Sequence, residues 1–212
     1  MIKIENTEVF GWEAAIRGMR NPMNSWEKSD TKFDIGFMDE ELGSNDLSLM
    51  KKLVAAGSDH RKFMRFINVT VDVTAPLYWW KEYDTYKVGT VANSCSTMHK
   101  IHDKPFHVDD FSTEHLIATD AVWNDYVPYR VLLTIITCLN WHRELYIKTK
   151  DKQHWWQMIQ LLPSSYNQRR TLQLNYEVLR NIYHARKNHK LDEWRQFCEW
   201  IESLPYSELI TE

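Results

Sequence analysis

Two groups of basic residues carry the clearest potential for chemistry in this sequence. The first surrounds an apolar stretch near residue 70 and comprises Arg61, Lys62, Arg65, Lys81 and Lys87. The second lies near the C-terminus and comprises Arg169, Arg170, Arg180, Arg186, Lys187 and Lys190. If the fold brought both groups together, their charged donors would form an anion site suited to phosphate. The spacing alone favours the alternative, in which these residues lie on solvated helix faces beside acidic neighbours.

The histidines and cysteines give weaker signals. His99, His102 and His107 lie close in sequence, but without the partner spacing of a zinc site we expect no metal. Cys95 lies four residues before His99, yet proximity in sequence does not establish a nucleophile and its base. The three cysteines form no CxxC pair, which is typical of proteins from a reducing compartment. We therefore expect a cytoplasmic protein.

Composition narrows the class of protein. The chain has 212 residues, 43% hydrophobic and 26% charged, which favours one globular domain spanning residues 1–212. A net charge of −3 gives no positive field that would attract nucleic acid or an anionic membrane. The N-terminus lacks the apolar core of a signal peptide, and the longest apolar run, from Val131 to Leu139, is too short to span a bilayer. We therefore expect neither nucleic acid nor membrane as a partner.

Hydrophobic periodicity predicts a mixture of helices and strands. Alternating apolar residues predict a strand over Phe66–Thr74, and Thr171–Asn175 is a second short strand or extended segment. Helical spacing predicts helices from Ser44 or Asn45 to about Ala56, from Pro76 to about Lys87, over Ser112–Leu162 with a division at Pro128, through Val178–Arg186 and through Leu191–Ile201. Residues 88–111 are interpreted as a loop. Trp194 and Trp200 are expected in the core, whereas Trp79 and Trp80 are not both expected there.

Three segments, taken in order, resemble the flavin-dependent thymidylate synthase family. The first is Leu49 to Gly57, followed by His60 and Phe63 before the expected strand. The second comprises Ala75-Pro76, Lys81-Glu82, Thr85-Tyr86-Lys87, Thr90, Asn93 and Ser96. The third comprises Leu162-Pro163, Asn175, Asn181, Arg186, His189 and Trp194. The resemblance covers about residues 45–205.

This resemblance implies an α+β fold, a single domain with a small antiparallel sheet and many helices. It implies FAD as cofactor, with methylenetetrahydrofolate and NADPH as co-substrates in the methylation of a pyrimidine deoxynucleotide such as dUMP. It implies sites shared between subunits of a homotetramer. By position, the family pattern assigns the nucleotide to Arg186, the expected catalytic residue, and to Ser96. It assigns the flavin to Lys87, Thr90, Asn175, Asn181 and His189.

The sequence also departs from the family pattern. The family signature Arg-His-Arg is Thr85-Tyr86-Lys87 here, and a flavin-side arginine of the family falls at Glu177. These replacements leave open a second interpretation, a nucleotide-binding or interaction protein on the same fold without flavin chemistry. A third is a mainly helical interaction protein with no small-molecule site, which the tryptophan-rich and glycine-poor composition favours.

Overall fold

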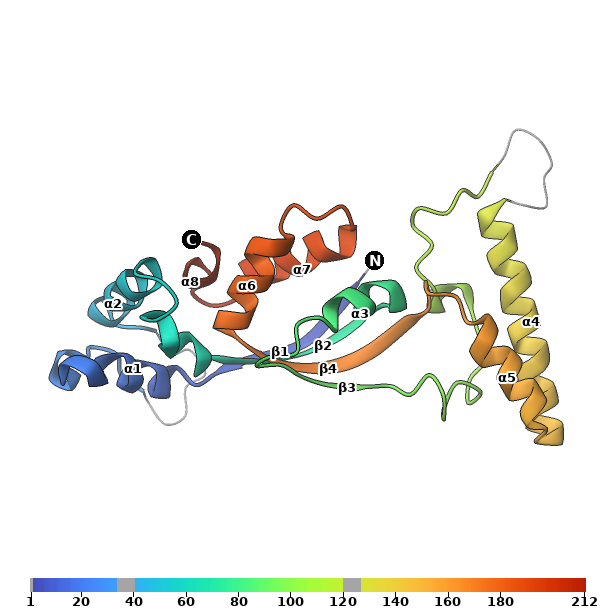
Figure 1. Ribbon diagram of the computed structural model, residues 1–212, viewed down its shortest axis with the longest axis horizontal. Helices are drawn as coiled ribbons and strands as arrows, with labels where there is room; N and C mark the ends of the chain where they lie inside the picture. The colour runs from blue at the N-terminus through green and yellow to red at the C-terminus, as the bar shows by residue number, and fades with distance from the viewer. Residues whose placement is uncertain (1, 34–40, 120–126) are drawn as a thin grey trace. The chain divides into compact units, whose positions relative to one another are not determined.

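The computed structural model describes residues 2–33, 41–119 and 127–212, and these form a mixed helix and sheet fold (Figure 1). The described strands form a four-stranded antiparallel sheet in the order β1-β2-β4-β3. This confirms the expected α+β class with a small antiparallel sheet. The described chain divides into two compact units built from interleaved segments. One comprises Met1–Lys3, Val73–Thr85 and Asn93–Arg170; the other comprises Ile4–Asp72, Tyr86–Ala92 and Thr171–Glu212.

The two inner strands of the sheet are the ones that the sequence predicts. They are β2 (Asn68–Pro76) and β4 (Asn167–Asn175). In β2 the odd-numbered residues from Val69 to Ala75 are buried and the even-numbered ones are half-buried, as the alternation predicts. The antiparallel register of β2 and β4 continues at both ends, because Tyr176 N donates to Ile67 O and Leu77 N donates to Tyr166 O.

The outer strands were not predicted. They are β1 (Lys3–Phe10) and β3 (Val91–Ser94). The interpretation of residues 88–111 as a loop is therefore wrong for Val91–Ser94. All four residues of β3 are exposed, so the strand carries no buried and exposed alternation from which it could be predicted.

The unit that contains Asn93–Arg170 has three described helices, α3 (Leu77–Tyr83), α4 (Pro128–Thr149) and α5 (Lys152–Leu161), and a 3-10 turn at Val108–Asp110. Helices α4 and α5 form a hairpin that contributes to the core of this unit. The core comprises Ile101, Phe106, Phe111, Leu132, Ile136, Leu139 and Met158. Pro128 starts α4 and does not divide a longer helix. A helix was expected over residues 112–119, but the structure has none there. The chain is instead extended at the start of this segment, where Phe111 bridges to Tyr166 and Ser112 N donates to Ser165 O. Residues 120–126, also expected to be helical, lie outside the described part.

Helix α3 differs from the prediction in the burial of its two tryptophans and in where it ends. Trp79 and Trp80 are both fully buried, at 0% and 1% exposure. Adjacent helical residues differ by about 100° in direction, not 180°, so a helix covered on two sides can bury both rings. The Trp80 indole donates to Gln168 O, and the Trp79 ring stacks on Tyr83. The helix ends at Tyr83, earlier than the expected Lys87.

The unit that contains Thr171–Glu212 holds the remaining helices. They are α1 (Trp12–Arg20), α2 (Ser44–Ala55), α6 (Tyr176–Arg186), α7 (Asp192–Glu202) and α8 (Glu208–Thr211), with 3-10 turns at Asn21–Met23, Trp26–Lys28 and Arg61–Arg65. Helix α2 begins at Ser44 as expected, but neither Ser44 nor Asn45 caps it, because the Asp30 carboxylate accepts hydrogen bonds from Asn45 N and Asp46 N. Trp194 is buried as expected, whereas Trp200 is half-buried and donates to Thr7 Oγ1.

None of the described helices combines the length and apolar character needed to cross a membrane.

Candidate functional site

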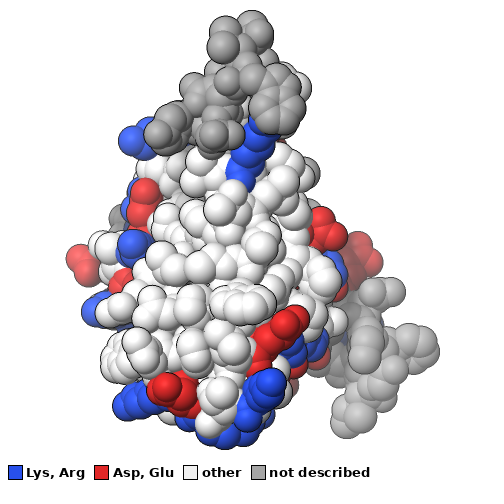
Figure 2. All heavy atoms as spheres, turned by 90° about the vertical axis from the view of Figure 1, so that its right-hand side faces the viewer, with Lys and Arg blue, Asp and Glu red and all other residues white. Residues whose placement is uncertain are grey.

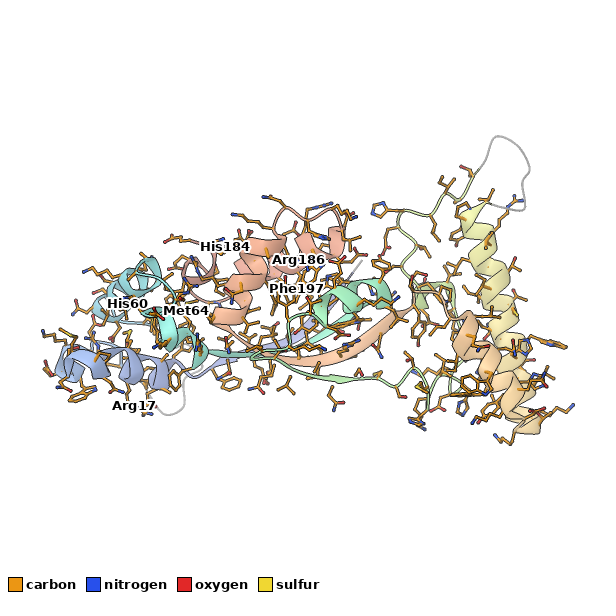
Figure 3. All side chains as sticks on the ribbon, in the orientation of Figure 1. Arg17, His60, Met64, His184, Arg186 and Phe197 are labelled. Atoms are coloured by element: carbon orange, nitrogen blue, oxygen red, sulfur yellow. The ribbon has the colours of Figure 1, made fainter. Side chains whose placement is uncertain are left out.

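Helix α6 positions Arg186 at its C-terminal end, as Figure 3 shows. Asn175 caps the start of the helix, because its Oδ1 accepts a hydrogen bond from Val178 N at 3.0 Å. Leu179 and Ile182 are completely buried and fix the inner face of the helix. Two of the predicted site residues, Asn175 and Arg186, therefore mark the two ends of one rigid element.

The Arg186 guanidinium lies against two aromatic rings. Its Nε donates to the Tyr86 hydroxyl at 2.8 Å, and its central carbon lies 4.8 Å from the Trp194 ring centroid. Trp194 is fully buried in α7, so this ring is a fixed surface for the half-buried arginine. A guanidinium held by this hydrogen bond and this ring contact has a fixed position, which suits its fork of N–H groups to paired hydrogen bonds with a phosphate or carboxylate.

The turn after α3 brings a second sequence segment onto α6. Gly89 has a backbone φ of +74°, and a Cβ at this position would lie 3.1 Å from Val178 Cγ2 and 3.2 Å from Asn175 Nδ2. A glycine is therefore needed both for the left-handed backbone and for the close approach. Thr90 Oγ1 donates to Tyr86 O at 2.5 Å, which closes the turn on itself. The structure thus brings Tyr86, Gly89 and Thr90 to the helix that carries Asn175 and Arg186.

The other predicted flavin residues of this unit lie near the same elements. Lys87 is exposed in the turn, and Asn181 is exposed on α6. His189 lies between α6 and α7, where its Nδ1 accepts from Leu191 N at 3.2 Å and its ring centroid is 6.3 Å from that of Trp194. These residues present an ammonium, an amide and an imidazole, each a donor that a ligand could use.

Ser96 belongs to the other compact unit. It is exposed there, and its Oγ accepts hydrogen bonds from Met98 N at 3.2 Å and His99 N at 2.9 Å. This local turn leaves Ser96 where the sequence predicts it, in the loop that follows β3.

Several residues of the two basic groups have structural partners. Arg61 forms a bidentate pair with Glu177, at 2.9 and 3.2 Å, and Glu177 is only 8% exposed. Arg170 pairs with Asp84 at 2.7 Å, and its guanidinium lies 4.2 Å from the Trp80 ring centroid. Arg180 donates to the Ile210 and Glu212 backbone carbonyls near the C-terminus. Arg61 and Arg170 therefore have the acidic neighbours that the alternative interpretation predicts, but both are half-buried and Arg170 lies in strand β4, so the prediction of solvated helix faces is wrong for them.

Tyr86 is the residue of this cluster that sequence reasoning did not assign. It was interpreted only as a replacement of the family histidine, whereas the structure places its hydroxyl on Arg186. The signal available in the sequence was its position, immediately before Lys87 in the segment that resembles the family signature.

A cavity of about 1350 Å³ lies elsewhere in the same unit. It is lined by the end of β1, the start of α1 and the segment after α7, and prominent members of the lining are Phe10, Trp12, Arg17, Trp200 and Tyr206. None of the predicted site residues lines this cavity.

The sequence matches no protein-family model, and no curated protein sequence matches it. The structure, in contrast, is similar to solved enzymes. A crystal structure of thymidylate synthase X (ThyX) from Helicobacter pylori with FAD and dUMP has a TM-score of 0.69 and 15% sequence identity, covering 100% of this chain and 97% of that chain. A second Helicobacter pylori ThyX structure, complexed with FAD and dUMP, also has a TM-score of 0.69, with 15% identity over 98% of this chain and 97% of that chain.

A third similar structure is the UMP/dUMP methylase PolB from Streptomyces cacaoi bound with 5-Br dUMP. Its TM-score is 0.63, with 14% identity over 100% of this chain and 94% of that chain. At these identities the likeness concerns the fold, and it extends over essentially the full length of both partners. The chain therefore has the fold of the flavin-dependent thymidylate synthases.

Proposed function

We propose that this chain is a single flavin-dependent thymidylate synthase-like domain that methylates a pyrimidine deoxynucleotide such as dUMP. The observation that carries the proposal is the contact between two segments of the family resemblance. Tyr86 and Arg186 are 100 positions apart and joined by a hydrogen bond, and Gly89 packs on Asn175. The similarity of the whole fold to structures that hold FAD and dUMP supports the same function.

The side chains around α6 include hydrogen-bond donors of the kinds that a flavin dinucleotide needs. They carry less positive charge than the family signature, because only Lys87 of the three signature positions is basic. The close approach at Gly89 exposes turn backbone beside the Asn175 amide, and Lys87 extends from the same turn. In the proposal, Lys87 binds the diphosphate, while Thr90, Asn175, Asn181 and His189 supply hydrogen bonds along the flavin. Bound flavin would supply a hydride, with methylenetetrahydrofolate as carbon donor and NADPH as reductant.

The nucleotide is assigned to Arg186 and Ser96. Arg186 would use its guanidinium to orient the pyrimidine nucleotide, because the Tyr86 hydroxyl and the Trp194 ring hold the side chain in place. Such positioning lowers the barrier by fixing the reacting carbon in line with its partner. Ser96, with the backbone N–H groups of its loop, would bind the phosphate in a homotetramer whose subunits share the site. The family pattern supports this last assignment.

A second candidate function is nucleotide binding without flavin chemistry. Two observations favour it. The first arginine and the histidine of the family signature are Thr85 and Tyr86 here, and the position of a flavin-side arginine is Glu177, which is buried and paired with Arg61. Both changes remove positive charge from the flavin side and leave Arg186 in place for a nucleotide.

Two binding measurements on the purified protein separate these functions. The visible spectrum, with an FAD titration, tests the flavin, and calorimetry with dUMP tests the nucleotide. Binding of both ligands supports the methyltransferase, and formation of dTMP on addition of methylenetetrahydrofolate and NADPH would establish it. Binding of dUMP without FAD at high micromolar concentration would support the second function. Binding of neither ligand would contradict both.

A further inference from the structure

Two histidines face each other across the hairpin of α4 and α5. His142 Nδ1 and His154 Nδ1 lie 3.1 Å apart, and the planes of the two rings differ by 34°. At this distance one Nδ1 donates a hydrogen bond and the other accepts it, so the pair shares one proton. Neither residue is among the histidines that the sequence singled out, His99, His102 and His107.

The connection between the two helices fixes the backbone at this pair. Helix α4 ends at a left-handed residue, Lys150, with a φ of +57°. Asp151 then caps α5, because its carboxylate accepts a hydrogen bond from Gln153 N at 2.9 Å. His154 N donates to Asp151 O at 3.1 Å in the same turn. The approach of α5 to α4 is therefore set by a short, hydrogen-bonded link.

The core of the unit supports the pair from below. Leu139 lies three residues before His142 and Met158 lies four residues after His154, so each is about one helical turn away. Both Leu139 and Met158 are completely buried, whereas the two histidines are half-buried. Packed helices thus hold the imidazoles in place while leaving them within reach of solvent, as a preorganised ligand pair requires.

The spacing of the two nitrogens suits a single metal ion. Imidazole nitrogen binds zinc at about 2.0–2.1 Å, so two nitrogens 3.1 Å apart would subtend an angle of about 100° at the ion. This angle lies between the roughly 90° of a square-planar or octahedral site and the roughly 109° of a tetrahedral one. A turn of each ring about its Cβ–Cγ bond, whose torsional preference is broad, would direct both lone pairs at the ion. The shared proton would move to Nε2 of its own ring, and both ligands would stay neutral.

The kind of ligand selects the kind of metal. Imidazole nitrogen suits Zn²⁺, Ni²⁺ and Cu²⁺, whereas Mg²⁺ and Ca²⁺ prefer the oxygens of carboxylates and carbonyls. Figure 2 shows the side of this unit on which α4 and α5 lie, and its Asp and Glu side chains are toward the edges of the view. Over residues 2–33, 41–119 and 127–212, no group of three or more His, Cys, Asp or Glu side chains could hold a metal ion. Water would therefore complete the coordination of an ion bound to the two histidines.

We propose that His142 and His154 together bind one divalent transition-metal ion, which clamps α4 to α5. Cu²⁺ should bind more tightly than Ni²⁺ or Zn²⁺, in the usual order for nitrogen ligands. This site does not depend on the proposed flavin or nucleotide chemistry, because it uses none of the residues assigned to either ligand.

Calorimetry with CuCl₂, ZnCl₂ and MgCl₂ tests the site in the full chain, purified without a histidine tag and freed of metal by a chelator. The parent protein should bind one Cu²⁺ or one Zn²⁺ at micromolar concentration and should not bind Mg²⁺. His142→Asn and His154→Asn each keep a polar group that can still bind the other ring. Each should weaken Cu²⁺ binding by at least about tenfold, the lower end of what losing a supporting group costs a metal site. The matched control is His99→Asn, which changes an exposed histidine of the same unit and should bind Cu²⁺ as the parent does.

Electron paramagnetic resonance of the Cu²⁺ complex counts the ligands directly. The spectrum should show two imidazole nitrogens in the parent protein and one in either single variant, and circular dichroism checks that each variant is folded. The proposal would be overturned by a parent protein that binds neither Cu²⁺ nor Zn²⁺ at high micromolar concentration, or whose Cu²⁺ spectrum shows a single imidazole. Unchanged Cu²⁺ affinity in folded His142→Asn or His154→Asn, or an equal loss in His99→Asn, would also overturn it.

Discussion

The Tyr86 hydroxyl accepts a hydrogen bond from Arg186 Nε at 2.8 Å, and this contact joins the turn after α3 to the end of α6. Both residues also lie near Trp194, whose ring centroid is 5.9 Å from that of Tyr86 and 4.8 Å from the Arg186 guanidinium carbon. Tyr86 therefore holds the Arg186 guanidinium from one side while Trp194 contacts it from another.

Replacing Arg186 by lysine should weaken nucleotide binding. A lysine keeps the charge but loses the planar fork and the guanidinium contact with Trp194, so dUMP affinity should fall by about 1–3 kcal/mol in free energy. Calorimetry with dUMP measures this loss. Arg65→Lys changes an exposed arginine of the same unit and is the control. Equal dUMP affinity of Arg186→Lys and the parent protein would remove Arg186 from the site.

Replacing Tyr86 by phenylalanine should have a smaller effect in the same direction. The ring and its contact with Trp194 remain, whereas the acceptor for Arg186 Nε is lost, so dUMP affinity should fall by about 1 kcal/mol. The melting temperature serves as the check on folding. If Tyr86→Phe binds dUMP as tightly as the parent protein, Tyr86 does not orient Arg186 for the ligand.

The Arg61–Glu177 pair offers a test of the flavin assignment. Glu177→Arg alone would place two guanidinium groups together in a half-buried position and should destabilise the protein by about 3–5 kcal/mol. Exchanging both residues, Arg61→Glu with Glu177→Arg, should recover much of that stability, as thermal melting would show. The exchange also puts an arginine where the family has one, so FAD should bind roughly tenfold more tightly than to the parent protein. Recovered stability with unchanged FAD affinity would place the flavin away from Glu177.

Gly89→Ala should impair both stability and flavin binding. The left-handed backbone at φ +74° costs a non-glycine residue about 1 kcal/mol, and the new Cβ would press on Val178 and Asn175. Gly57→Ala is a matched control, because Gly57 also has a positive φ, of +104°, but a Cβ there would meet nothing within 4 Å. Urea unfolding should show a larger loss for Gly89→Ala, and FAD titration should show a loss for that variant only. Equal losses in both variants would contradict the packing argument.

Stability should decrease in acid because of the buried Asp46. Burial alone would raise the pKa of this carboxyl, but hydrogen bonds from Thr31, Ser29 and Arg20 lower it from 3.8 to about 2. A pKa lower in the folded state than in the unfolded state stabilises the protein above pH 4, by about 2 kcal/mol for this shift. That contribution should be lost between about pH 4 and pH 2.

Asp46→Asn should remove this acid sensitivity and lower stability at neutral pH. The substitution leaves Arg20 charged, only 4% exposed and without its carboxylate partner, which should cost about 3–5 kcal/mol. Urea unfolding from pH 2 to pH 7 compares the two proteins. The same slope of stability against pH in Asp46→Asn and the parent protein would show that another group controls the acid transition.

The sequence by itself determined the inner parts of the fold. Strand β2 was predicted because its apolar residues alternate, and α6 and α7 were predicted because one face of each is apolar. In each of these elements one face is buried, so apolar residues recur at the regular interval of a strand or a helix. This periodicity can be read from a short stretch of sequence. The order of the three family-like segments likewise predicted the fold that the structural comparisons show.

Tertiary structure decided the rest. The edge strands β1 and β3 are mostly exposed, so they exist through hydrogen bonds to neighbouring strands and leave little pattern in the sequence. Trp79 and Trp80 are both buried because α3 is covered on more than one side, which no single helical pattern encodes. The Tyr86–Arg186 hydrogen bond depends on a turn whose left-handed glycine packs against a helix 86 positions later, and only the folded chain brings these groups together.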